Sequence, residues 1–486
     1  MTQRSSRRMQ PPTSSRQRRH RARRRKGLCL TDRPVVEVHA AGIDIGAREI
    51  YVAVPPDRDA EPVRVFTTFT EDLHRLAAWL RACGITTVAM ESTGVYWIPL
   101  YGILEAADIR PCLVDARHLK NVPGRRTDWH ECQWLQYLHS VGLLRAAFRP
   151  EAAVRALRTL MRHRHNLVEM ASQHVLLMQK ALTQMNLQIH HVISDLTGST
   201  GLAILDAILA GERNATVLAR LRDPRIRASE ATIRESLIGD WRPEELFAVQ
   251  QSLTHYRLYQ AQIAACDREL ARGVAAFTAR VDPAERPLPP DRKRDRRRRP
   301  RHARTSPTVP AWDLRTELYK VFGVDVTQIP GVATIALSLL TELGRDMTKW
   351  ETAAHFASWL AVCPDNDITG GRVVYTRVRK VNNRAAQLFR LAAYSLHHSQ
   401  TPLGDYLRRM KAKLGPAAAT TATAHKIAVI FYTMVKRQME YDDTLWAARN
   451  AQRQQREAIR LRQRAARLGY QLVPFTPDAG AATAEA

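Results

Sequence analysis

Four acidic residues in the first third of the chain have the type and spacing to bind divalent cations. Asp44 lies between two isoleucines in a strand pattern, where an unpaired carboxylate is costly to bury. Glu91 ends a second apolar strand pattern, at a position where open α/β sheets assemble their sites. Asp128 and Glu131 are three residues apart in a helical pattern, so both side chains face the same way. Such a set suits Mg²⁺, which prefers oxygen ligands and is commonly shared between carboxylates and a substrate phosphate.

The chemistry that such a cluster predicts is phosphoryl transfer. Two magnesium ions held by carboxylates activate the attacking oxygen and stabilise the leaving oxygen. Taken one at a time, the acids have simpler interpretations: Asp44 caps a turn, and Asp128 and Glu131 belong to a solvated helix face. Both interpretations stay open at this point, because one sequence does not show whether the four side chains converge.

The charge of the chain predicts a polyanionic partner. Its 486 residues include 74 Lys and Arg against 47 Asp and Glu, a formal net charge of +27. The six cysteines form no Cys-x-x-Cys pair, so we expect ordinary buried thiols and not a zinc or redox site. We find neither an apolar run long enough to cross a membrane nor a signal-peptide core, and we therefore expect a cytoplasmic protein with no membrane partner.

The elements that would position the acids belong to an α/β domain. Residues 1–38 are rich in arginine and predict a disordered basic arm with affinity for phosphate. Residues 39–148 alternate β-branched runs with helical stretches, which predicts a mixed sheet. The expected strands fall within 40–47, 50–55, 63–69, 86–92 and 109–115, with a helix at about 71–83.

Residues 149–282 predict a helical region with coiled-coil character. From Val154 to Ile189 apolar residues recur at alternating spacings of three and four, and only Arg164 breaks the seam. A second helix, from Pro243 to about Ala276, repeats the spacing with polar gaps at Gln260 and Asp267. The two helices can pack as an antiparallel pair or across subunits, and we expect a homo-oligomer built on this region. A plain helical bundle is the alternative.

The remainder of the chain predicts one more folded domain. Residues 283–311 are rich in proline and arginine and predict a flexible basic linker. Residues 312–440 predict a mainly helical domain, 441–468 a basic helix suited to a DNA or RNA backbone, and 469–486 a disordered tail.

Three segments around the acids resemble a known family: GIDIG, VAMESTGVYW and VPGRRTDWHECQWLQYLHSVGLL. They are similar to the RuvC-like (RNase H-like) catalytic domain of the DEDD transposases, the bridge-RNA-guided insertion-sequence one-ten family. The segments IPGVATIALSLLTELG, FASWLAVCPDNDITGGRVV, NNRAAQLFRLAA and TATAHKIAVIFYTMVKR resemble the family's second domain, so the resemblance covers most of residues 40–440.

The resemblance implies an enzyme that cuts and rejoins donor and target DNA, with Mg²⁺ as cofactor and a structured guide RNA as partner. It implies that Asp44, Glu91, Asp128 and Glu131 bind the metal, although the family motif has aspartate where this chain has Glu131. It also implies a hydroxyl nucleophile in the DITGG segment, where Thr369 stands in place of the family's serine. Threonine keeps the hydroxyl but has a stiffer, bulkier side chain.

Two further signals are consistent with nucleic-acid binding. QIPGVATIALSLLTELG reads as a helix-hairpin-helix-like element, in which Gly331 precedes a helix start that can present backbone N–H groups to phosphate. A basic cluster follows Thr369 and could neutralise a phosphate near that hydroxyl, or form a solvated face; its members are Arg372, Arg377, Arg379, Lys380 and Arg384.

Two alternative functions remain open on the sequence. RuvC-like acids alone would make a hydrolytic nuclease or a junction resolvase, which needs no protein nucleophile. If Glu131 and Thr369 are inactivating substitutions, the chain is a non-catalytic nucleic-acid-binding relic.

Overall fold

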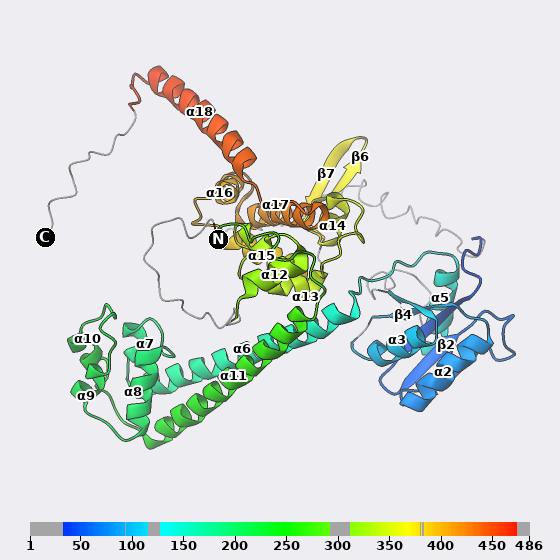
Figure 1. Cartoon of the computed structure of the whole chain (residues 1–486), viewed down its shortest axis with the longest axis horizontal. Helices are drawn as coiled ribbons and strands as arrows, with labels where there is room; N and C mark the ends of the chain where they lie inside the picture. The colour runs from blue at the N-terminus through cyan, green and yellow to red at the C-terminus, as the bar shows by residue number, and fades with distance from the viewer. Residues whose placement is uncertain are drawn as a thin grey trace, which may run out of the picture. The chain divides into compact units, whose positions relative to one another are not determined.

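The structure is a computed structural model that describes residues 33–92, 94–114, 127–291, 312–379, 381 and 383–473. The chain divides into two compact units, Met1–Arg149 and Pro150–Ala486, which we describe separately (Figure 1). The expected arm up to residue 32, the linker from 292 and the tail from 474 lie outside the described residues.

Unit 1 is built on a five-stranded mixed sheet with the strand order β3-β2-β1-β4-β5. Strand β2 is antiparallel to both β1 and β3, whereas β4 is parallel to both β1 and β5. The strands are β1 (Ala40–Ile45), β2 (Glu49–Ala53), β3 (Val63–Thr67), β4 (Thr87–Glu91) and β5 (Arg110–Val114). The mixed α/β sheet predicted from the sequence is confirmed.

Helices cover both faces of this sheet. The helices are α2 (Thr70–Ala82), α3 (Trp97–Ala106) and α5 (Asp128–Ser140). Side chains of one parity along the strands, such as Ile43 and Met90, form a core with Leu76 of α2 and Leu104 of α3. Residues of the other parity, such as Ala89, pack against α5. Alternation along each strand therefore sends every second side chain to the α5 face.

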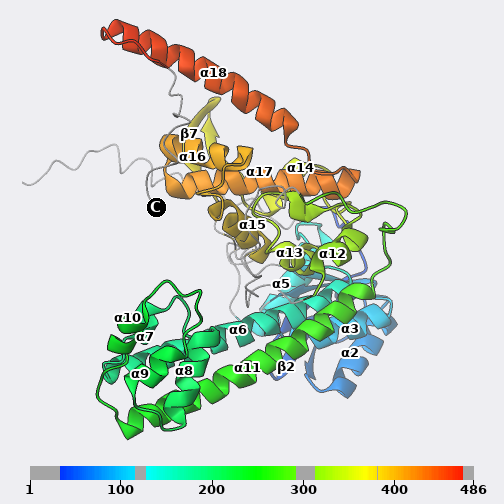
Figure 2. The ribbon, with the colours of Figure 1, turned by 60° about the vertical axis from the view of Figure 1, so that its left-hand side comes forward.

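Unit 2 begins with two long helices that pack against each other, α6 (Ala152–Gln184) and α11 (Pro243–Ala275), each of 33 residues. Figures 1 and 2 both show them side by side. Their contacts run in reverse order along the pair: Leu157 with Gly273, Arg164 with Asp267, His174 with His255, and Gln184 with Glu245. Of the two packings left open by the sequence, the antiparallel pair within one chain is the one in the structure.

Four short helices lie between the long ones in sequence: α7 (Ile189–Val192), α8 (Ser199–Leu209), α9 (Ala215–Arg220) and α10 (Glu230–Glu235). Their apolar side chains, including Ile204, Leu218 and Ile233, share a core with Leu182 and Val249 of the long helices. This small cluster therefore caps the far end of the pair.

The rest of unit 2 is mostly helical, as predicted. Its elements are α12 (Leu314–Phe322), η2 (Val326–Gln328), α13 (Ala336–Leu343), α14 (Ala353–Trp359), α15 (Arg384–Tyr394), α16 (Pro402–Leu414), α17 (Pro416–Arg437) and α18 (Thr444–Arg467). Helix α17 contacts α14, α15 and α16. Phe431 of α17 lies edge-on to Phe322 and Phe389, with ring centroids 5.7 Å apart in each pair. Aromatic burial thus holds this helical core together.

A two-stranded hairpin, β6 (Asp365–Thr369) and β7 (Arg372–Arg377), interrupts the helices between α14 and α15. Apart from the half-buried Asp365, its residues are exposed. Among the described residues, no helix has the length and apolar character needed to cross a lipid bilayer.

Candidate active site

A close approach between β1 and α5 positions the predicted carboxylates. A Cβ atom on Gly42 would lie 2.2 Å from both the carbonyl oxygen of Cys132 and the backbone nitrogen of Gln136. No side chain fits there, so glycine lets the α5 backbone lie directly on the strand. The side-chain Nε2 of Gln136 donates a hydrogen bond to the carbonyl oxygen of Ala40 at 3.3 Å. Helix α5 therefore runs along β1 with its first turn near the strand's carboxyl end.

Asp44 and Glu91 lie at the same edge of the sheet and on the same face. Strands β1 and β4 are parallel, and their register pairs Ile43 with Met90, so Asp44 and Glu91 are the next residues of the two strands. Residues two apart in a strand lie on the same face of the sheet. Asp44 therefore shares the face of Gly42, and Glu91 shares the face of Ala89, which packs against α5. Both carboxylates are half-buried and belong to the α5 face of the sheet.

Asp128 and Glu131 occupy the first turn of α5. Thr127 caps this helix, accepting a hydrogen bond from the backbone nitrogen of His130. Asp128 is one turn before the buried Cys132, which places it on the stripe that faces the sheet, and Glu131 is half-buried beside it. The helix dipole also favours acids at this end, so these residues stabilise α5 whatever else they do.

Tyr51 also lies beside these acids, although no pattern in the sequence singles it out. The antiparallel register places Tyr51 of β2 directly opposite Asp44, and its hydroxyl donates to Glu49 at 3.0 Å. The pKa of Tyr51 is raised, first by that hydrogen bond and the charge of Glu49, then by burial, and further by Asp128 and Asp44. Two of the four predicted acids, Asp44 and Asp128, therefore lie near enough to this phenol to affect its pKa.

The charges of Asp44 and Asp128 also affect the pKa of the Cys132 thiol. Burial raises the pKa of its thiol to about 12, with smaller contributions in the same direction from Asp44 and Asp128. This thiol is 0% exposed and stays protonated at neutral pH. The prediction of an ordinary buried thiol therefore fits this position.

The predicted carboxylates do not form a complete set of metal ligands among the described residues. Within the described part of the chain, no three His, Cys, Asp or Glu side chains converge closely enough to hold a metal ion. The chemistry of the donors nevertheless fits Mg²⁺: Asp44, Glu91 and Asp128 offer carboxylate oxygens from three different elements at one edge of the sheet. A divalent cation would offset the repulsion between these like charges.

Thr369 lies at the tip of the β6–β7 hairpin in unit 2. It pairs with Arg372 across a two-residue loop formed by Gly370 and Gly371, whose φ angles are 59° and 75°. Positive φ at both loop residues is the geometry of a type I′ turn, which glycine adopts without strain. Thr369 is exposed, and a Cβ added to either glycine would meet nothing within 4 Å. The hydroxyl is therefore open to a large substrate.

The basic residues after Thr369 spread over several elements. Arg372 is the cross-strand partner of Thr369, whereas Arg377 lies at the base of the hairpin, 3.5 Å from Asp365. Arg379 donates to the carbonyl and hydroxyl oxygens of Ser358 at the end of α14. Arg384 begins α15 and is exposed. Lys380 lies outside the described residues. Arg372 is thus the member of this set that the structure places beside the threonine.

Gly331 has a packing reason to be glycine. Its φ is 85°, and a Cβ there would lie 2.5 Å from the carbonyl oxygen of Ala392 in α15. Helix α13 begins five residues later, at Ala336, after the turn that follows η2. Gly331 therefore lies in a tight turn between η2 and α13 that packs against α15, and both the helix-hairpin-helix-like element and phosphate binding there stay predictions.

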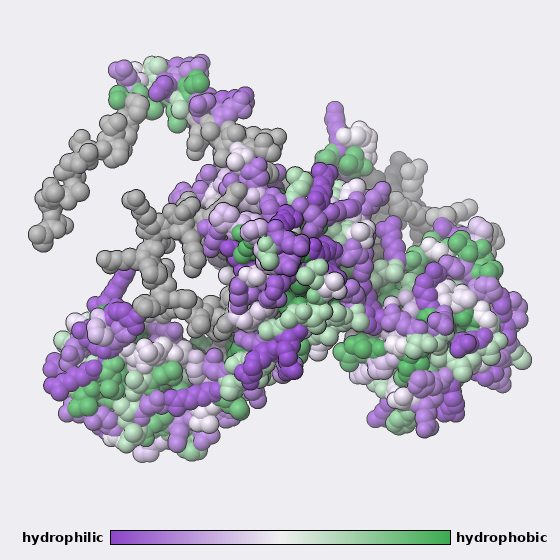
Figure 3. All heavy atoms as spheres, viewed as in Figure 1, coloured by the Kyte–Doolittle hydropathy of each residue, from purple (hydrophilic) through white to green (hydrophobic). Residues whose placement is uncertain are grey.

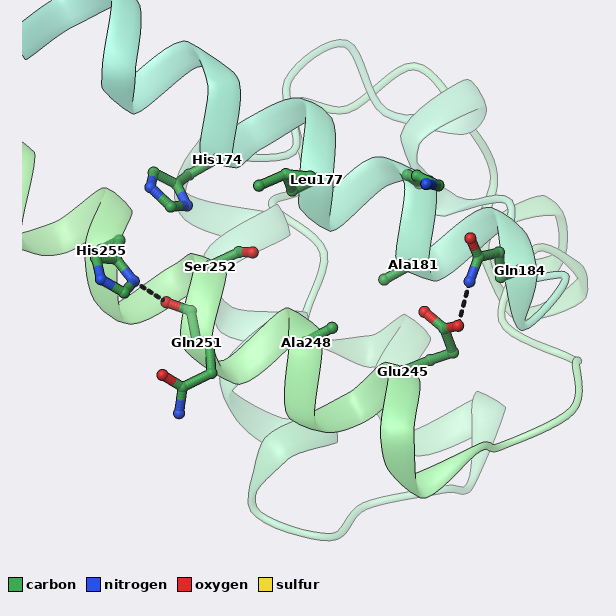
Figure 4. Close-up of a pocket in the computed structure, with 10 residues that line it drawn as sticks. His174, Leu177, Ala181, Gln184, Glu245, Ala248, Gln251, Ser252 and His255 are labelled. Carbon is green, nitrogen blue, oxygen red and sulfur yellow. Dashed lines mark hydrogen bonds between the residues drawn. The ribbon is translucent and has the colours of Figure 1, made fainter.

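An open groove of about 400 Å³ lies between α6 and α11 (Figure 4). It forms because Ala181, Ala248 and Ser252 leave little side-chain volume between the two helices. His174 stacks on His255 at one end, and burial, followed by the charge of His255, lowers the pKa of His174. Glu245, the carboxylate of this lining, accepts a hydrogen bond from Gln184. The groove therefore lacks the clustered acids that phosphoryl transfer needs.

Comparison with known families adds two matches. Residues 41–187 match a transposase family model of the DEDD type named for IS110, and residues 325–407 match the model of the transposase IS116/IS110/IS902 family. The first match contains the whole sheet of unit 1, α5 and α6, and the second runs from η2 into α16 and contains the hairpin. No curated protein shows significant similarity to the chain.

Proposed function

The chain belongs to the IS110 family of transposases, and from that premise we propose that it cuts and rejoins DNA with two sets of residues, one in each unit. The observation that carries the proposal is the placement of Asp44, Glu91 and Asp128 at one edge and one face of a mixed sheet. The order and directions of the strands fit a RuvC-like domain.

In unit 1, Asp44, Glu91, Asp128 and Glu131 are the residues that would hold Mg²⁺. Bound there, the metal supplies Lewis-acid stabilisation of the charge that develops on the phosphate oxygens. The chain's own contribution is to hold the carboxylates on rigid elements: Gly42 fixes α5 on β1, and the sheet register fixes Asp44 beside Glu91. Tyr51, the cross-strand neighbour of Asp44, donates its hydroxyl hydrogen to Glu49. The carboxylate of Glu49 is thereby held by Tyr51.

In unit 2, Thr369 supplies the nucleophile. Its hydroxyl oxygen bonds to a DNA phosphorus and loses its proton to a base, while the bond from that phosphorus to one flanking deoxyribose oxygen breaks. The departing strand takes up a proton and leaves as a free hydroxyl end, and the other strand end stays joined to the protein through a phosphothreonine ester. A hydroxyl end from a second DNA molecule then attacks the ester, which joins the two DNAs and restores Thr369.

Arg372 lies where it can assist this step. It is the cross-strand partner of Thr369, and its planar guanidinium can donate two hydrogen bonds to the phosphate under attack. The absence of side chains at Gly370 and Gly371 lets a DNA backbone approach the hairpin tip.

A structured RNA and a homo-oligomer complete the proposal. The net charge of +27 leaves basic surface for RNA as well as DNA, and a guide RNA would specify the two sites by base pairing. An oligomer would let the carboxylates of one copy serve the threonine of another.

The test is recombination of donor and target DNA with Mg²⁺ and RNA transcribed from the flanks of the element. We expect Asp44→Asn and Asp128→Asn each to lower the yield of joined product at least a hundredfold. Glu71→Gln is the matched control, because Glu71 is an exposed acid in the first turn of α2, on the opposite face of the sheet. Glu131→Asp should retain activity, since it keeps the charge and shortens the side chain by one methylene.

A hydrolytic nuclease is the alternative that the acids alone allow. It would release free ends without joined product, and its cutting would survive Thr369→Ala. Joined product that persists in Asp44→Asn would instead overturn the role proposed for the carboxylates.

A further inference from the structure

Helix α18 carries a straight stripe of arginines along one side. Arg456, Arg460, Arg464 and Arg467 follow one another at spacings of four, four and three residues. At about 100° per residue, the four positions fall within about 80° of the helix circumference. Arg462, by contrast, projects from nearly the opposite side of the helix. Most of the arginines of this part of α18 therefore lie on one side of the helix.

This stripe is available to a partner. All four arginines are exposed, and within the described residues none of them makes an ion pair. Among the helices of its unit, α18 contacts α16, and residues 455–464 are exposed throughout. Figure 3 shows hydrophilic side chains interspersed with a few hydrophobic ones along the far part of α18. In the part of the chain that the structure describes, these four arginines are thus available to an external anion.

We propose that α18 is a binding arm for the phosphate backbone of a nucleic-acid duplex. From Arg456 to Arg467 the stripe is about 17 Å long, at about 1.5 Å of rise per residue. Over that length one strand of a duplex presents about five phosphates. Four guanidinium groups at regular spacing on a rigid helix therefore match a partner whose charges are equally regular and rigid. The proposal concerns binding alone and does not depend on the chemistry proposed for Thr369 and the carboxylates.

The opposite side of α18 argues against a membrane as the partner. Helices that lie in a membrane surface bury a broad face of Trp, Phe or Leu. Opposite the stripe, α18 has Ala458 and Ala465, whose methyl groups offer little apolar area. Its larger exposed apolar side chains are divided between the two flanks of the stripe, Ile459 on one and Leu461 on the other, so no broad apolar face forms. The exposed arginines therefore favour electrostatic attraction to phosphate over insertion of this helix into a membrane surface.

The test is the salt dependence of binding, measured with the full chain. A 30-base-pair DNA duplex, the equivalent RNA duplex and a single strand of thymidines are titrated at several salt concentrations without Mg²⁺, so that no cleavage occurs. Each arginine on a phosphate contributes about 0.9 to the slope of log K against log salt for duplex DNA. We expect the variant with Arg→Gln at 456, 460, 464 and 467 to lower that slope by about 3 to 4 on at least one duplex. The DNA and RNA arms identify which duplex is bound.

Arg460→Gln and Arg462→Gln form a matched pair, two residues apart with the same exposure and on different sides of the helix. The first should lower the slope by about 1 and the second should leave it unchanged. Circular dichroism checks that glutamine preserves the helix. Equal effects of the two single changes, or an unchanged slope in the fourfold variant on both duplexes, would overturn the proposal. The proposal would also be overturned if the variant with four substitutions lost salt dependence on the single strand alone. Binding of the wild type to anionic vesicles but not to duplexes would overturn it as well.

Discussion

Arg164 of α6 and Asp267 of α11 bind each other through two hydrogen bonds, from Nε at 2.5 Å and from Nη2 at 3.2 Å. Each residue interrupts an otherwise apolar helix seam; the Arg164 side chain is buried, with 3% exposed, and the Asp267 side chain is half-buried, with 14% exposed. The two polar breaks in separate heptads are therefore partners across the pair. Any sliding of α6 along α11 would bury an unpaired charge, so this contact fixes the antiparallel register.

Removing one partner of that pair should be costly. Asp267→Ala leaves the Arg164 guanidinium buried without its carboxylate, and we expect a loss of about 3 kcal/mol in the free energy of unfolding. Chemical denaturation of the full chain, followed by the helical signal, measures the change. Replacing both residues by leucine should recover most of the loss, because the seam then becomes apolar throughout. A double variant as unstable as the single one would contradict a register set by this pair.

Gly42 should tolerate no side chain. In Gly42→Ala the new methyl carbon would lie 2.2 Å from backbone atoms of α5, so the helix must move away from β1. We expect the free energy of unfolding to fall by about 1–3 kcal/mol. Recombination should fall further than the loss of folded protein explains, because the displaced helix carries Asp128. Gly102→Ala is the control: Gly102 lies inside α3 with nothing within 4 Å of its added Cβ. That change should stabilise unit 1 by about 0.5–1 kcal/mol.

His139 should make unit 1 sensitive to acid. Its Nε2 lies 2.9 Å from the hydroxyl of Thr87, and burial lowers its pKa. As pH falls through the ordinary histidine pKa, His139 becomes protonated in the unfolded chain but stays neutral in the folded chain. The stabilising contribution is thus present above that pH and is lost below it, by at most about 1.4 kcal/mol per pH unit.

Hydrogen-exchange protection of β4, compared between pH 7.5 and pH 5.5, measures this effect. His139→Gln can still bond to Thr87 and should reduce the pH dependence. His74→Gln, at an exposed position on α2, should leave it as in the wild type. If protection in the wild type is the same at both pH values, His139 is not the acid-sensitive group.

Substitutions at Gly370, in the hairpin tip, should affect recombination according to whether the new residue adopts a positive φ, and not according to its size alone. Asparagine followed by glycine is a favoured type I′ pair, so Gly370→Asn should keep recombination near the wild-type level. Gly370→Val forces a β-branched residue to a φ of 59° and should lower activity strongly, while thermal unfolding stays unchanged because the hairpin is exposed. Similar activity in both variants would show that the turn geometry does not position Thr369.

Local patterns in the sequence predicted the sheet and the long helices because each is encoded within a few neighbouring residues. Alternation marks β1 and β4, and the heptads mark α6 and α11. The pairing of Arg164 with Asp267 was not predictable, because it joins positions 103 residues apart and depends on the direction in which α11 returns. The α7–α10 cap was likewise missed, since such short helices owe their form to packing on the long pair.

The candidate site was only partly predictable for the same reason. Asp44 and Glu91 stood out because acids are rare at apolar strand positions. Tyr51 looked like an ordinary strand residue, and only the register of β1 with β2 places it opposite Asp44. The role of Gly42 depends on where α5 docks, which no short pattern encodes. Thr369 entered by resemblance alone, and the structure adds its exposed place on the hairpin.

The covalent intermediate tests the central claim most directly. Nicked DNA whose cleaved strand diffuses away traps the ester, and mass spectrometry of the digested protein locates the attached nucleotide. We expect the adduct on Thr369, its retention in Thr369→Ser and its loss in both Thr369→Ala and Asp44→Asn. Recombination at the wild-type level by Thr369→Ala, or an adduct on another residue, would contradict the account.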